Sequence, residues 1–116
     1  MRILLPVLLL VSMFVAVAQE KKGGGAPPKN LQLLQPADVR AAMQAFRTGL
    51  GVQCTFCHVQ GDFAADDNPH KATARRMITL TKEVNAKFPD GKEHVTCFTC
   101  HRGAEHPLTE APAAAQ

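Results

Sequence analysis

Two short segments that share one pattern of cysteine and histidine constrain this chain more than any other feature. Residues 54–58 read CTFCH and residues 97–101 read CFTCH, so both follow C-x-x-C-H, and together they use all 4 cysteines of the 116 residues. This pattern is the attachment site of c-type haem. Two thiols one helical turn apart can form thioethers with the two vinyl groups on one porphyrin edge, and the next imidazole reaches the iron. The sequence therefore predicts two covalently bound c-type haems, held by Cys54, Cys57, Cys97 and Cys100, with His58 and His101 as proximal iron ligands.

Three other uses of paired cysteines fit the sequence less well. A zinc ribbon also has two C-x-x-C pairs, usually about 15–20 residues apart, but 39 residues lie between Cys57 and Cys97, and zinc gives no reason for a histidine after both pairs. A thioredoxin-like redox pair needs one C-x-x-C near a βαβ unit, which the sequence does not indicate. Two disulfides would suit an exported chain, although adjacent C-x-x-C loops are a poor way to hold a fold together.

The first eighteen residues have the three-part layout of a secretory signal peptide. Arg2 supplies a positive start, an apolar run begins at Ile3, and Ala16-Val17-Ala18 has the form of a cleavage signal. The run is shorter than the roughly 20 residues that span a bilayer comfortably. We predict cleavage after Ala18 and a periplasmic protein, with an uncleaved membrane anchor as the alternative. Export agrees with the haem prediction, because c-type haem is attached outside the bacterial cytoplasm.

Beyond the leader we expect one small, mainly α domain between two ends that lack a core pattern. The predicted boundaries are a signal peptide at 1–18, a flexible linker at 19–35, a dihaem domain at 36–107 and a disordered tail at 108–116. Few large apolar residues remain once the leader is removed, and a domain this small usually needs disulfides, metals or cofactors in place of a larger core. The predicted fold is a small multihaem cytochrome c of two helix–turn–C-x-x-C-H units with little or no sheet.

Helical periodicity predicts two helices, at about 36–48 and about 69–87. In the first, Gly49 and Gly51 are expected to end a helix whose apolar stripe is Val39, Ala42, Met43, Phe46 and Leu50. In the second, Asn68 is a natural N-cap and Pro69 suits the first helical position. Its stripe is Ala74, Met77, Ile78, Thr81, Val84 and Phe88.

The two methionines outside the leader are candidates for the distal iron ligands. Met43 and Met77 each lie in a predicted helix upstream of one C-x-x-C-H segment, which gives a weak internal repeat. A methionine on an apolar stripe is ordinarily core filler, but the pairing of two methionines with two haems favours axial ligation. A distal Met raises the reduction potential and supports electron transfer, a second His lowers it, and an open site allows peroxide chemistry. His94 is the leading substitute if Met77 is not the ligand, whereas His70 and His106 are expected at the surface.

Residues beyond the generic haem pattern resemble the cytochrome c subunit family of photosynthetic reaction centres. The resemblance rests on GLGVQCTFCH at 49–58, on Asp66-Asp67-Asn68-Pro69 with Lys71, on Ala74–Ile78 and Val84-Asn85, and on VTCFTCHRG at 95–103 with Pro107. It covers about 36–107, and the chain looks like one two-haem half of a family that binds four haems. It implies His58 with Met43 on the first iron and His101 with Met77 on the second.

The expected function is that of an exported dihaem cytochrome that carries single electrons and performs no bond-making chemistry. The alternatives are a peroxidase-like dihaem enzyme with one open distal site and a haem subunit of a membrane oxidoreductase complex. Expected partners are redox proteins, among them a membrane-bound complex, and a homodimer would restore a four-haem array. Nucleic acid and a small-molecule substrate are not predicted. Arg75, Arg76 and Arg102 are equally consistent with haem-propionate partners and with a solvated basic surface.

Overall fold

The computed structural model describes residues 26–114, so the predicted signal peptide at 1–18 lies outside the described residues. Its elements, in chain order, are α1 (Val39–Leu50), the short 3-10 helix η1 (Cys54–Phe56), α2 (Pro69–Asn85) and α3 (Cys97–His101). In this part of the chain there is no strand, and Val59 and Asp62 form an isolated antiparallel bridge. The prediction of a mainly α fold with little or no sheet is confirmed. None of the described helices combines the length and the apolar character needed to cross a membrane.

Helix α1 starts three residues later than the sequence predicts and extends two residues further. The carbonyl of Asp38 accepts the first helical hydrogen bond, from the Ala42 N–H at 2.9 Å. The helix ends where Gly51 adopts a left-handed conformation with φ 67° and its N–H bonds to the Arg47 carbonyl. Gly49 lies inside the helix and does not stop it, which corrects one expectation. The apolar stripe that the sequence predicts on α1 is half-buried.

Helix α2 begins as the sequence predicts and ends two residues earlier. The Asn68 side chain accepts a hydrogen bond from the His70 N–H at 3.0 Å, and Pro69 occupies the first turn. After Asn85 the backbone tightens: the N–H groups of Lys87 and Phe88 bond to carbonyls three residues back. The chain then turns away before the Pro89-Asp90-Gly91 segment that was expected to end the helix.

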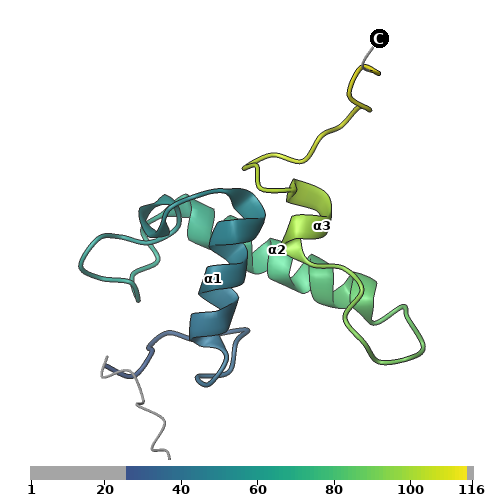
Figure 1. Ribbon diagram of the computed structural model, residues 1–116. Coiled ribbons are helices and arrows are strands. Elements are labelled where there is room, and N and C mark those ends of the chain that lie inside the picture. Colours follow the sequence, from purple (N-terminus) through teal and green to yellow (C-terminus); the bar gives the residue numbers. More distant parts are fainter. Residues whose placement is uncertain (1–25, 115–116) are drawn as a thin grey trace, which may run out of the picture.

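The second C-x-x-C-H segment forms a helix of its own, α3, which periodicity did not indicate because it is only five residues long. A reciprocal capping box starts it, since the Thr96 side chain accepts from the Thr99 N–H and the Thr99 side chain accepts from the Thr96 N–H. α1 and α3 are the two helices that pack against each other most closely. They lie side by side on one side of α2 (Figure 1).

Glycines make the close contact between α1 and α3 possible. The Gly103 N–H bonds to the Gly49 carbonyl at 2.8 Å. A Cβ atom at Gly49 would lie 3.0 Å from Cys97 Cβ, and one at Gly51 would overlap the Gly103 carbonyl. The C-terminal end of α1 is therefore held against the second haem motif, so an element of the first unit positions the cysteines of the second.

No apolar side chain is buried in residues 26–114, although the helices are well formed. Helix α2 in particular exposes Met77, Leu80 and Val84, which are 40%, 50% and 37% exposed. Helices of this size are marginal in water without an apolar face to pack against. The protein chain by itself therefore leaves its apolar faces partly uncovered, as expected if large prosthetic groups complete the core.

Candidate functional site

The first haem motif follows α1 through a short turn. Within it the N–H groups of Cys57 and His58 both bond to the Cys54 carbonyl, at 3.3 and 3.0 Å. These bonds wind the segment through one turn, so the two thiols and the imidazole are brought to one short stretch of backbone. Cys54 is exposed, and Cys57 and His58 are half-buried.

The second haem motif reaches the same one-turn spacing as a capped α-helix. Arg102 closes α3 in a left-handed conformation, φ 54°, with its N–H on the Phe98 carbonyl. Here Cys97 is half-buried and Cys100 is exposed. Burial raises the pKa of the Cys57 and Cys97 thiols, which favours the neutral thiol over the thiolate that binds zinc. In residues 26–114 the thiols do not gather into a cluster of three or more metal ligands, as a zinc ribbon would need.

Both motif histidines are held in the same way by backbone carbonyls. His58 Nδ1 lies 2.9 Å from the Phe63 carbonyl oxygen, and His101 Nδ1 lies 3.0 Å from the Ala104 carbonyl oxygen. A carbonyl can only accept, so in each neutral ring Nδ1 carries the proton and Nε2 keeps a free lone pair. Iron-bound histidines generally have their second nitrogen fixed in this manner. The sequence did not reveal these partners, because a backbone carbonyl has no residue-type signal.

A polar cluster ties the loop after the first motif to α2. Lys71 Nζ donates to the Phe63 and Ala65 carbonyls, at 2.9 and 2.7 Å. Asp66 accepts from Asn30 at 2.9 Å and pairs with Arg75 at 3.0 Å. The hydrogen bond from Asn30, followed by that from Arg75, lowers the pKa of the exposed Asp66 carboxyl to about 2. Asn30 belongs to the segment expected as a linker, so part of that segment contacts the domain.

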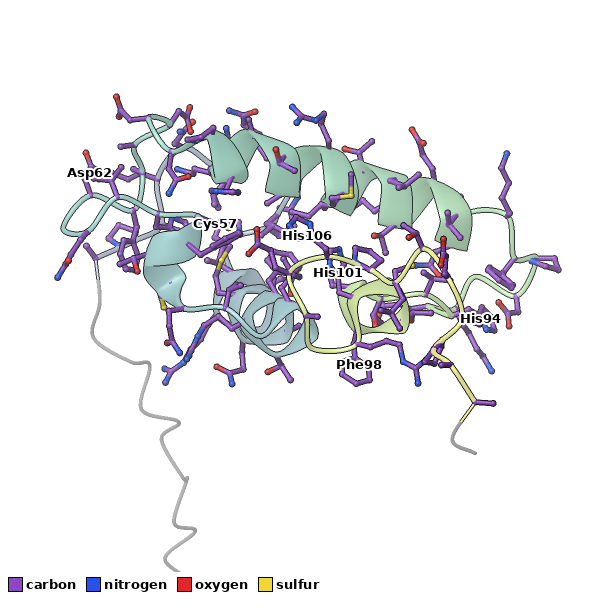
Figure 2. The ribbon with its side chains drawn as sticks, turned by 90° about the horizontal axis from the view of Figure 1, so that it is seen from above. Cys57, Asp62, His94, Phe98, His101 and His106 are labelled. Atoms are coloured by element: carbon purple, nitrogen blue, oxygen red, sulfur yellow. The ribbon has the colours of Figure 1, made fainter. Side chains whose placement is uncertain are left out.

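The remaining predicted residues lie on separate elements. Met43 is half-buried on α1, and Met77 is 40% exposed on α2. His94 Nε2 faces the Asp90 carboxylate, at 2.8 Å to Oδ2, so the nitrogen that a distal ligand would present is engaged. Figure 2 shows His94 at the far end of the molecule from Cys57.

The two predicted surface histidines and two of the three candidate arginines have protein or solvent partners. His106 is 86% exposed and His70 is also exposed, as expected. The His70 ring lies tilted against that of Phe56, with ring centroids 4.1 Å apart. Arg75 pairs with Asp66, and Arg76 donates to the Thr73 hydroxyl at 2.9 Å. These contacts account for the two arginines within the chain itself.

The donor set fits c-type haem. In each motif the two thiols lie one helical turn apart and are followed by an imidazole with a free Nε2. Apolar side chains of α1 and α2 are incompletely covered. In Figure 2 the labelled Cys57 and His101 lie between the ribbon of α2 and those of α1 and α3. The fold and these donors define a c-type cytochrome.

Comparison with known proteins identifies the family. The profile described as "Photosynthetic reaction centre cytochrome C subunit" matches residues 15–111. The chain therefore belongs to this family of haem electron-transfer cytochromes, and the resemblance found in the sequence is confirmed.

Several curated relatives are similar to parts of the chain. Cytochrome c-554 of Chloroflexus aurantiacus is 39% identical over 88 residues, which are 68% of this chain and 21% of that protein. The photosynthetic reaction center cytochrome c subunits of Thermochromatium tepidum and Rubrivivax gelatinosus are 46% and 33% identical over 55 and 95 residues. These regions cover 43% and 62% of this chain, and 13% and 26% of the relatives. The chain thus spans about a quarter or less of their length. No solved structure matches it.

Proposed function

We propose that this chain is an exported dihaem c-type cytochrome that carries single electrons between redox partners. Cys54 and Cys57 hold the first haem, and Cys97 and Cys100 hold the second. The axial ligands are His58 and Met43 for the first iron, and His101 and Met77 for the second. The haem-binding unit is the domain at 36–107.

The shared state of the two motif histidines carries the proposal. Each donates its Nδ1 proton to a carbonyl a few residues downstream, so each presents a free Nε2 without further rearrangement. The hydrogen bond also fixes the ring and makes it a more basic ligand. Two unrelated surface histidines would have no reason to adopt this same arrangement directly after a pair of cysteines.

When bound, each haem supplies a one-electron ferric–ferrous couple, and the chain supplies the ligands and the shielding. The half-buried stripe of α1 and the exposed apolar residues of α2 provide surfaces that a porphyrin can cover. Thioether ligation of iron by Met43 and Met77 raises the potential into a range that suits electron transfer. With both axial positions filled, no position remains open for a substrate.

Absorption spectroscopy of the ferric protein tests the ligands. Methionine-ligated ferric haem has a weak charge-transfer band, and we expect its intensity per protein to correspond to two haems. Met43→Ala and Met77→Ala should each remove about half of this band, and the double variant should remove all of it. His94→Ala and His106→Ala are the matched controls and should leave it unchanged. A high-spin ferric signal in the unmodified protein would contradict the carrier and favour the peroxidase-like alternative.

Mass spectrometry tests the cofactor count and the export together. The protein recovered from the periplasm should carry the mass of two haems and lack residues 1–18. Recovery of a chain with one haem or none would refute the dihaem assignment.

The partner that we propose is a membrane-bound electron-transfer complex that receives electrons on the periplasmic side.

A further inference from the structure

The Phe63 carbonyl oxygen accepts two hydrogen bonds, one from the histidine of the first haem motif and one from a lysine of α2. His58 Nδ1 donates to it at 2.9 Å, and Lys71 Nζ donates to it at 2.9 Å. Lys71 is the one charged or polar residue that is buried in the described part of the chain, at 9% exposure. A buried ammonium group is therefore linked to the proximal histidine through a single oxygen atom.

The charge of Lys71 is only partly neutralised by its surroundings. Its carboxylate neighbour is Asp66, with 3.4 Å between Nζ and Oδ1, and the same oxygen pairs with Arg75 at 3.0 Å. One carboxylate oxygen thus pairs with two cations, so Asp66 does not fully neutralise Lys71. Asp66 is also half-exposed, at 52%, whereas the Lys71 side chain is 11% exposed, so the solvent screens the anion more than the cation.

The second haem motif lacks this arrangement. The Ala104 carbonyl that holds His101 accepts, among residues 26–114, no bond from a lysine or arginine side chain. The two motifs therefore share the proximal hydrogen bond but differ in what lies behind it. This difference gives the two motif histidines different electrostatic surroundings.

We propose that Lys71 is a positioning residue that raises the reduction potential of the haem at His58 and leaves that of the haem at His101 unchanged. The inference rests on the proposed dihaem function. An oxygen that already binds an ammonium group is a weaker acceptor for the His58 proton, so the imidazole donates less electron density to ferric iron. The buried positive charge also favours the ferrous state directly. Both effects act in the same direction.

Spectropotentiometric titration of the haem-loaded protein measures this effect. Lys71→Gln keeps a hydrogen-bond donor but removes the charge, and we expect it to lower one of the two reduction steps by about 59 mV, a tenfold change in a one-electron equilibrium. Met43→Ala, which alters the ligation of the first iron, should move the same step. Lys71→Arg keeps the positive charge and should leave both reduction potentials at their unmodified values. A purely structural role of the lysine amine would not predict this.

Lys82→Gln is the matched control for the charge change. Lys82 lies on the same helix and also donates to a backbone carbonyl, that of Leu33 at 2.7 Å. We expect it to leave both steps in place. An equal shift of both steps in Lys71→Gln, no shift, or a shift as large in Lys82→Gln would each overturn the proposal.

A second variant should shift the same reduction potential in the opposite direction while keeping the lysine. Asp66→Asn removes the exposed carboxylate and leaves the Lys71 bonds to Phe63 and Ala65, so the same step should rise. If Lys71→Gln cannot be obtained with haem bound, Asp66→Asn still tests the inference. A reduction step of the first haem that is unmoved or lowered in this variant would refute it. Loss of the second haem from the unmodified protein would instead refute the dihaem function itself, so the two failures are distinguishable.

Discussion

At the scale of single residues, Gly51 and Gly91 adopt the same left-handed conformation in different surroundings. Their φ angles are 67° and 68°, but a Cβ on Gly91 would meet nothing within 4 Å, whereas one on Gly51 would overlap the Gly103 carbonyl. We expect Gly91→Ala to cost about 1–2 kcal/mol through backbone strain alone. Gly51→Ala should cost clearly more, because it also separates α1 from α3. Denaturant unfolding of the haem-loaded protein compares the two, and equal losses would show that the overlap relaxes freely.

Individual residues also show which features of the fold and the site can be predicted from the sequence and which cannot. The cysteine pattern, the Asn68-Pro69 helix start and the stripe of α1 were predictable, because each depends on residue types at local spacing. Gly49 was wrongly expected to stop α1, since its role depends on the distant Cys97, which periodicity does not reveal. No residue type indicates the histidine bonds to the Phe63 and Ala104 carbonyls or the burial of Lys71, because these depend on how the loops fold back.

At the scale of elements, the Asp66 cluster links the N-terminal segment, the loop after the first motif and α2. Hydrogen bonds from Asn30 and then Arg75 lower the Asp66 pKa from 3.8 to about 2. A carboxyl whose pKa is lower in the folded state stabilises that state above pH 4, and the stabilisation is lost as the pH falls toward 2. We expect Asp66→Asn to flatten this part of the melting-temperature profile, and Asn30→Ala to move the Asp66 pKa toward 3.8. A profile unchanged by Asp66→Asn would contradict the assignment.

At the scale of the whole molecule, no apolar side chain is buried in the described range, so covalently bound haem would complete the fold. We expect the variant with Cys54, Cys57, Cys97 and Cys100 all changed to Ser to lose most of its helical circular dichroism and to melt without a cooperative transition. Without covalent haem, the faces of α1 and α2 have too little to pack against. The unmodified loaded protein is the reference, and a cooperative transition in the haem-free variant would show that the chain folds by itself.

The bond between the Gly49 carbonyl and the Gly103 N–H also has a consequence in time. A chain synthesised from its N-terminus cannot close this contact until nearly all of it has emerged. The bonds that hold the first motif, from His58 and Lys71 to Phe63, join residues within a short stretch. If haem is attached early at residues 54–58, its proximal histidine is already oriented. The C-terminal end of α1 cannot yet contact the second motif at that stage.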